Sequence, residues 1–139
     1  MDFRRSTRTR CALALFAALA LTAMPANAQA VSNPVAVFTG LDKITGRITI
    51  FDVYIDETVQ FGSLQLTPRV CYSRPTTEAQ SVSAFVQVDE VSLQATMEQV
   101  FSGWMFADSP ALNAIDNAVY DVWLIDCRQT SDVPPPDQR

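Results

Sequence analysis

The chain has 139 residues, with 15 acidic and 10 basic side chains and no histidine, and its formal net charge at pH 7 is −5. This length fits one small domain, and the acidic balance excludes a protein that meets nucleic-acid phosphates with a basic surface. Without histidine, the chain lacks the commonest general base and metal ligand, which excludes Ser-His-Asp and Cys-His catalytic sites.

Residues 1–28 predict a secretory signal peptide. Four arginines lie within the first ten residues, an apolar run follows from Cys11 to about Ala23, and Ala26-Asn27-Ala28 has the small-x-small form of a cleavage site. The apolar run is shorter than the ~20 residues that a membrane-spanning helix needs. We therefore expect cleavage after Ala28, a periplasmic location and no transmembrane anchor afterwards. The mature chain would carry six basic and fourteen acidic residues, a net charge of −8, which also argues against anionic lipid surfaces as partners.

From residue 35 onward, short runs rich in β-branched and aromatic residues alternate with turn-forming residues, a pattern that predicts strands. These runs cover residues 35–38, 47–55, 58–61, 64–72, 84–91, 100–106 and 119–127. Six or seven short strands with frequent turns predict an all-β fold, a small antiparallel sandwich or barrel. We expect a single β domain over residues 35–128, preceded by a short mobile segment at 29–34.

Alternation along the strands predicts which side chains face the core. In the 47–55 run, the expected core face consists of Thr49, Phe51, Val53 and Ile55. In the 64–72 run, one face consists of Leu64, Leu66, Val70 and Tyr72. Cys71 then falls on the opposite, more polar face, which would place it near the rim of the fold.

The mature chain keeps two cysteines, Cys71 and Cys127. Two thiols in a small exported domain usually pair, and a bridge that closes a loop of about 57 residues would stabilise the fold by ~4 kcal/mol in the loop-entropy model. The alternative is a redox-active dithiol, but such cysteines usually lie two residues apart. We therefore predict one structural disulfide.

The segment between the last two predicted strands is longer than a hairpin requires. Ser109 and Pro110 form a helix-start signal, with Ser109 as the cap and Pro110 in the first turn, so one short helical turn is expected. We predict a recognition loop here, and its candidate residues are Asp108, Ser109, Pro110, Asn113, Asp116 and Asn117. Residues 129–139 contain three consecutive prolines and predict a disordered tail.

The sequence lacks the residues that several other kinds of functional site require. No glycine-rich phosphate loop and no cysteine cluster is present, so we expect neither a cofactor nor a bound metal. A glycosidase needs two carboxylates ~5–9 Å apart, whereas on regular strands Asp89 and Glu90, like Asp121 and Asp126, point to opposite faces. We therefore predict a protein that is not an enzyme.

Aromatic side chains offer an alternative function. Five of them could form a sugar-stacking platform, namely Tyr72, Trp104, Phe106, Tyr120 and Trp123. Most aromatic residues of so small a domain are needed in its core. A carbohydrate- or cell-wall-binding β module is thus the second hypothesis.

Three blocks of the sequence carry a family resemblance: residues 38–53, FTGLDKITGRITIFDV; residues 61–75, FGSLQLTPRVCYSRP; and residues 101–127, FSGWMFADSPALNAIDNAVYDVWLIDC. They resemble an alphaproteobacterial family of small exported proteins known as domain of unknown function 2155. The resemblance implies no enzymatic activity. It implies an accessory protein that docks on an envelope or respiratory membrane complex. The complex that the resemblance suggests is the proton-pumping NADH:quinone oxidoreductase, at its periplasmic side.

Overall fold

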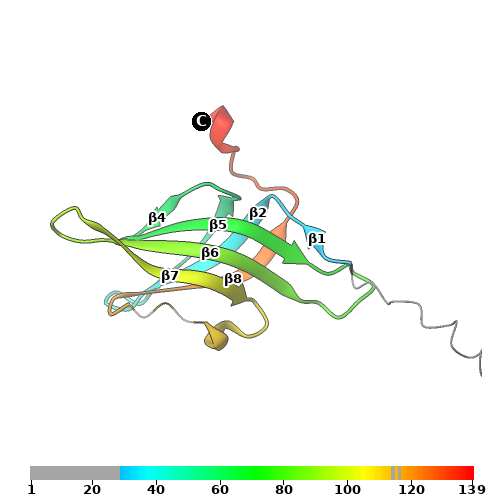
Figure 1. Ribbon diagram of the computed structural model, residues 1–139, viewed down its shortest axis with the longest axis horizontal. Coiled ribbons are helices and arrows are strands. Elements are labelled where there is room, and N and C mark those ends of the chain that lie inside the picture. Colours follow the sequence, from blue (N-terminus) through cyan, green and yellow to red (C-terminus); the bar gives the residue numbers. More distant parts are fainter. Residues whose placement is uncertain (1–28, 114, 116) are drawn as a thin grey trace, which may run out of the picture.

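The computed structural model describes residues 29–113, 115 and 117–139, and the predicted signal peptide therefore lies outside the described residues. In these residues the chain forms eight strands and two short 3-10 turns (Figure 1). The strands are β1 (Val31–Ser32), β2 (Val35–Asp42), β3 (Arg47–Tyr54), β4 (Val59–Phe61), β5 (Leu64–Ser73), β6 (Val82–Val91), β7 (Met97–Phe106) and β8 (Tyr120–Arg128). The turns are η2 (Pro110–Leu112) and η3 (Pro136–Gln138).

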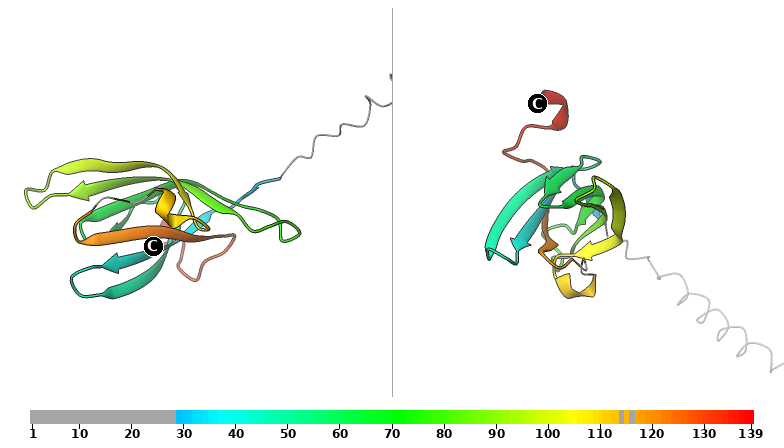
Figure 2. Two further views of the ribbon diagram at one scale, coloured as in Figure 1. Left: turned by 90° about the horizontal axis from the view of Figure 1, so that it is seen from below. Right: turned by 90° about the vertical axis from the view of Figure 1, so that its left-hand side faces the viewer.

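The strands form two antiparallel sheets that pack face to face (Figure 2). Sheet A has the order β1-β5-β6-β7, and β4 also pairs with β5. Sheet B has the order β3-β2-β8. The predicted all-β antiparallel fold is confirmed, as a sandwich of two sheets, and η2 lies where the short helical turn was predicted.

The core lies between the sheets and consists of the inward faces of β2 to β8. Its fully buried side chains include Phe38 of β2, Leu64 and Leu66 of β5, and Val86 and Val88 of β6. Burying a Leu or Val side chain contributes about 1.5–3 kcal/mol. The predicted core face of β3 is also correct, because Val53 is fully buried and Phe51 and Ile55 pack against the core.

A disulfide joins Cys71 of β5 to Cys127 of β8, with the two Cα atoms 5.7 Å apart. The predicted bridge is confirmed, and it links sheet A to sheet B. Its predicted place at a polar rim is wrong, because Cys71 is fully buried and Cys127 is 7% exposed. The reason is a bulge in β5 at Arg69: Pro68 pairs with Val86 and Val70 with Phe85, so the alternation shifts by one residue and Cys71 joins the core face.

Aromatic rings and glycines interlock at the end of the sandwich near the β2–β3 turn. The rings of Phe38, Phe51 and Phe61 follow one another with centroids 6.0 and 5.6 Å apart, and Phe61 meets Tyr120 edge to face at 5.6 Å. Phe61 lies over the backbone of Gly40, and Tyr120 lies over Gly62, so closely that a Cβ atom on either glycine would overlap the ring. The two sheets are thus in contact here through aromatic rings that pack directly against the backbone of glycines.

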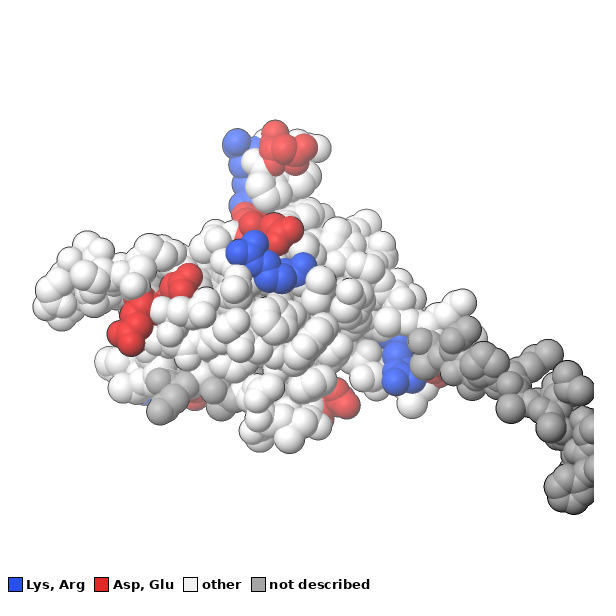
Figure 3. All heavy atoms as spheres, viewed as in Figure 1, with Lys and Arg blue, Asp and Glu red and all other residues white. Residues whose placement is uncertain are grey.

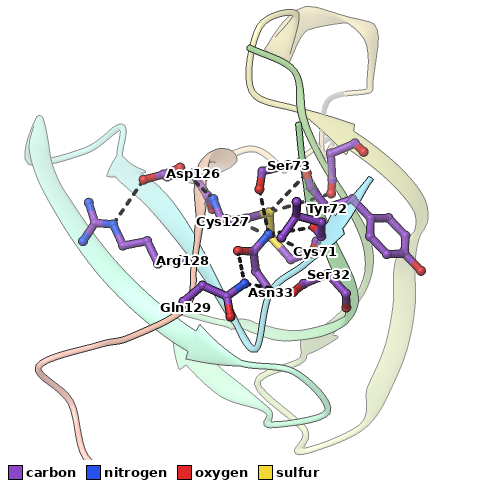
Figure 4. The surroundings of a disulfide bond; sticks show 11 residues. Ser32, Asn33, Cys71, Tyr72, Ser73, Asp126, Cys127, Arg128 and Gln129 are labelled. Carbon is purple, nitrogen blue, oxygen red and sulfur yellow. Dashed lines mark hydrogen bonds and ion pairs between the residues drawn. A yellow bond between two sulfur atoms is a disulfide. The ribbon is translucent and has the colours of Figure 1, made fainter. Parts of the chain in front are cut away.

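Both ends of the domain are tied to the sandwich near the disulfide (Figure 4). Asn33 is buried; its side-chain amide donates hydrogen bonds to the Cys71 carbonyl and to the Ser73 hydroxyl, and its carbonyl accepts one from Gln129 at 2.7 Å. The segment 29–34, for which the sequence predicts mobility, thereby pairs β1 with β5.

The tail, for which the sequence predicts disorder, contacts β3. Ser131 donates a hydrogen bond to Asp52, and the Tyr54 hydroxyl donates one to the Val133 carbonyl at 2.7 Å. Farther along, Arg139 forms an ion pair with Glu57, at 2.8 Å. The tail therefore runs from the end of β8 to β3 and flanks the C-terminal half of that strand.

Alanine variants of Gly62 and Gly46 distinguish two reasons why a position requires glycine, namely a positive φ and a lack of space for a Cβ atom. Both have positive φ, 60° and 71°, but a Cβ atom at Gly62 would lie 2.3 Å from the Tyr120 ring, whereas Gly46 has open space around it. A left-handed conformation costs a non-glycine residue about 1–2 kcal/mol. We expect G46A to lower the free energy of unfolding by about that amount and G62A by about 3 kcal/mol or more, since overlap adds to the strain. Urea denaturation measures both, and equal losses would contradict the packing described here.

Candidate functional site

The predicted recognition loop, residues 107–118, has both exposed and buried residues among those that the structure describes. Asp108, Pro110 and Asn113 are exposed and Ser109 is half-buried, whereas Asn117 is only 8% exposed. Asp116 lies outside the described residues. The expected cap is wrong, because Ser109 precedes η2 but makes no side-chain capping hydrogen bond.

Asn117 ties the loop to both sheets and is a structural residue. Its amide donates to Glu90 of β6 at 2.8 Å, and its side-chain oxygen accepts from the backbone N–H groups of Val119 and Tyr120, each at 2.9 Å. The Asn117 carbonyl accepts a hydrogen bond from Lys43, at 2.9 Å. Because these bonds use all the polar atoms of a buried side chain, Asn117 is not free to contact a partner.

An apolar pocket of about 300 Å³ opens between this loop and β8. Pro110 and Ile115 line it from the loop, and Asp121, Val122 and Trp123 line it from β8. Asp121 forms an ion pair with Lys43 at 2.7 Å, which places one fixed charge pair at its border. Pockets of this kind receive an apolar anchor side chain of a partner protein.

The pocket continues onto the outer face of sheet B. Since Phe38 faces the core, Thr39 and Leu41 face outward, and the strand register places Thr39 between Ile50 and Trp123. Leu41 pairs in the same way with Ile48. Ile48 and Ile50 are 63% and 64% exposed. We call the surface formed by Leu41, Ile48, Ile50 and Trp123 the apolar face.

The outer face of sheet A carries a second apolar feature. Tyr72 and Trp104 stack with ring centroids 6.2 Å apart, and Phe85 meets Trp104 edge to face at 5.6 Å. We call these three residues the aromatic patch. A shallow pocket of about 170 Å³ adjoins it, and serine hydroxyls and Arg74 contribute to its lining. Figure 3 shows that this side of the molecule is largely uncharged, with charged side chains in separate groups.

The five aromatic residues considered as one sugar platform do not gather at one place. Tyr72 and Trp104 lie on the outer face of sheet A, Tyr120 packs between the sheets, and Trp123 lies on the outer face of sheet B. Phe106 follows Trp104 two positions later on the same strand and so shares its face. A sugar platform is therefore restricted to the outer face of sheet A.

Asp121 and Asp126 do not form a catalytic pair of the glycosidase kind. A bulge at Ile125 turns Asp126 to the same face as Asp121, against the alternation expected from the sequence. Their partners on β2, Leu41 and Val37, are four positions apart, which corresponds to roughly 13 Å and exceeds the ~5–9 Å of glycosidases. In the part of the chain that the structure describes, no group of three or more acidic or cysteine side chains could hold a metal ion.

One carboxyl has a shifted pKa. The pKa of Asp42 lies below its usual value, chiefly because the Thr45 backbone N–H donates a hydrogen bond to it, with a further contribution from Ile44. These bonds shape the exposed turn between β2 and β3. Asp42 and Arg47 also line a polar pocket of about 220 Å³ at the open end of the sandwich.

A family model described as an uncharacterized protein conserved in bacteria, DUF2155, matches residues 36–127. The chain belongs to this family. The matched segment begins in β2 and ends at Cys127, so it contains all of both sheets except β1, the first residue of β2 and the last residue of β8, together with both cysteines and the recognition loop. No curated protein and no solved structure matches the chain. Among the described residues, no helix is long and apolar enough to cross a membrane.

Two asparagines of the loop form a matched pair of variants. We expect N117A to lower the free energy of unfolding by about 2–3 kcal/mol, since it leaves the amides of Val119 and Tyr120 and the Glu90 carboxylate without their partner. Asn113 is exposed and donates one hydrogen bond, to the Trp104 carbonyl. We therefore expect N113A to cost less than about 1 kcal/mol. Equal urea midpoints for the two variants would contradict the anchoring role of Asn117.

Proposed function

We propose that the protein is a non-enzymatic accessory protein of the bacterial envelope that docks on a membrane complex through its apolar face. The exposure of Ile48 and Ile50 on the outer face of sheet B is the observation that carries the proposal. Soluble monomers rarely leave a large contiguous apolar surface in water, and such surfaces mark interaction sites. The pocket beside Trp123 adds a cavity into which an anchor side chain of the partner fits.

The energetics favour a protein partner. Burying an exposed isoleucine contributes about 1.5–3 kcal/mol, so covering Ile48 and Ile50 supplies a useful part of the free energy of a specific complex. The ion pair between Lys43 and Asp121 at the border adds a polar rim. An apolar centre with a polar rim is the usual anatomy of protein interfaces.

The proposed cellular location rests on the N-terminal sequence and on the disulfide. Arginines, an apolar run and Ala26-Asn27-Ala28 support export with cleavage after Ala28, and the Cys71–Cys127 bridge fits an oxidising compartment. We place the protein in the periplasm of an alphaproteobacterium. The complex to test first is the proton-pumping NADH:quinone oxidoreductase, at its periplasmic face.

The two tryptophans provide the test. A tagged protein is purified from detergent-solubilised membranes as wild type, as W123A and as W104A, and co-purifying subunits are identified by mass spectrometry. We expect W123A to lose at least about 90% of the partner, because Trp123 lies on the apolar face and at the pocket. W104A should retain it, because Trp104 lies on the other sheet.

Each outcome of that experiment is informative. The thermal midpoint of each variant shows whether the change has merely unfolded the domain. Wild-type protein that emerges from solubilised membranes as a free monomer contradicts docking. Loss of the partner with W104A and not with W123A would move the interface to sheet A.

The aromatic patch supports a second candidate function, a carbohydrate- or cell-wall-binding module. Trp104 is 39% exposed and stacks with Tyr72, and Arg74 and Ser83 are among the residues that line the adjoining pocket. A sugar stacks its C–H face on an aromatic ring while its hydroxyls take hydrogen bonds from such groups.

Titration with solubilised peptidoglycan fragments, followed by tryptophan fluorescence, tests the module. We expect a saturable change in wild type and in W123A, and none in W104A, because only Trp104 adjoins the pocket. Wild-type fluorescence that stays constant up to millimolar fragments would exclude this function.

A further inference from the structure

β3 is an edge strand of sheet B. Among the described residues it pairs only with β2, while β2 lies between β3 and β8. Figure 2 shows the β2–β3 hairpin at one margin of the molecule. An edge strand presents a row of backbone donors and acceptors that lack a neighbouring strand.

The alternation of hydrogen bonds identifies those groups. The N–H of Ile55 donates to the Pro34 carbonyl of the segment before β2, at 2.9 Å. Tyr54, one position earlier, points the other way: its N–H donates to the Glu57 carboxylate and its carbonyl accepts from the Glu57 N–H. Because the direction alternates along an antiparallel strand, the backbone groups of Ile48 and Ile50 also point to the open edge.

The other edges of the sandwich are protected, and this one is not. β1 has two residues and β4 has three, and short edge strands are poor templates. β7 and β8 are each interrupted by a bulge in their pairing with the neighbouring strand. β3 has eight residues in unbroken register with β2, and it contains neither proline nor a charge between Arg47 and Asp52. Ile48 and Ile50, the residues with open backbone groups, also have the exposed side chains.

We propose that β3 pairs with β3 of a second copy of this chain in an antiparallel, two-fold symmetric contact. Sheet B then continues across the axis as one sheet with two β3 strands at its centre. The contact is isologous, since each copy offers the same strand. The proposal goes beyond the docking function, because it uses an edge of sheet B and leaves the face itself open to a partner.

The side chains select the register. At the open edge the hydrogen-bonded pairs must join even-numbered residues, and the odd-numbered residues between them oppose each other without hydrogen bonds. Pairing Ile48 with Ile50 of the second copy gives two identical apolar pairs, about four backbone hydrogen bonds, and Thr49 opposite Thr49 on the axis. The next register, shifted by two residues, would oppose Ile48 and Asp52, an apolar residue and a carboxylate. The first register is therefore favoured.

The charged residues of β3 leave the centre of the strand uncharged. β3 begins with Arg47, which is exposed and forms no ion pair among the described residues, and it carries Asp52 near its other end. Because side chains alternate along a strand, Arg47 and Asp52 point to opposite faces, and neither charge opposes the pairing of Ile48 with Ile50. The tail contacts Asp52 and Tyr54 through side chains, which leaves the Ile48 and Ile50 edge open.

Sedimentation equilibrium of the purified, disulfide-intact protein measures the contact. We expect a concentration-dependent dimer, and we expect I50K to raise its dissociation constant at least about tenfold, since two apolar pairs are lost and lysine opposes edge pairing. L93K is the matched control, because Leu93 is fully exposed in the turn between β6 and β7. A strict monomer up to ~1 mM, or equal weakening by L93K, overturns the proposal.

A cysteine at the axis tests the register. We expect T49C to form a disulfide-linked dimer under mild oxidation, because opposed residues that are not hydrogen-bonded across the pair bring their Cβ atoms to roughly 4.5 Å. S102C, at an exposed position of β7, is the control and should remain uncrosslinked. Efficient cross-linking of I50C in place of T49C would overturn the proposed register, and equal cross-linking at all three sites would overturn specific pairing.

The two proposals fail separately. A monomer that still co-purifies with a membrane complex removes the β3 contact and keeps the docking function. A dimer that co-purifies with nothing does the reverse. Co-purification that I50K abolishes while the wild type sediments as a monomer would support docking through the apolar face, to which Ile50 belongs, and it would refute the contact between copies.

Discussion

The bond between Cys71 and Cys127 is the constraint on which the arrangement of the sandwich depends. It joins β5, at the centre of sheet A, to β8, which belongs to sheet B. β8 has β2 as its only strand neighbour among the described residues, so the bridge is its covalent link to the opposite sheet. In the loop-entropy model a bridge over this span contributes about 4 kcal/mol, a large share of the stability of so small a domain. The buried Asn33 closes this end of the core against water.

The opposite end is held without a covalent bond. Rings of Phe61 and Tyr120 rest on the backbone of Gly40 and Gly62, and Asn117 bonds to Glu90 of sheet A while its carbonyl accepts a hydrogen bond from Lys43 of the β2–β3 turn. These contacts hold the long loop against β8 and keep its pocket open. The loop therefore acts as one wall of a surface whose larger part is sheet B.

The two sheets differ in what they present to the outside. Sheet A carries stacked aromatic rings with hydroxyls beside them, a surface suited to a sugar. Sheet B carries exposed isoleucines and an apolar pocket, which suit a protein. Because the faces lie on opposite sides of the core, one molecule has room for both kinds of contact, and a substitution on one face leaves the other in place.

The amino-acid sequence was sufficient to predict the β class, the approximate positions of seven of the eight strands described, the core face of β3, the pairing of the two cysteines and the family. The strands and the core face follow from local alternation and turn residues, and the pairing of the cysteines follows from the presence of only two thiols after residue 28. β1 lies in a segment for which the sequence predicts mobility, so it was not predicted. The bulges at Arg69 and Ile125 were decided by tertiary structure, because a bulge depends on the partner strand and moves Cys71 and Asp126 to faces that strict alternation does not give them. The loop could be recognised in the sequence because it is one continuous segment. The apolar face could not, because Leu41, Ile48, Ile50 and Trp123 come together only when β2 pairs with β3 and with β8.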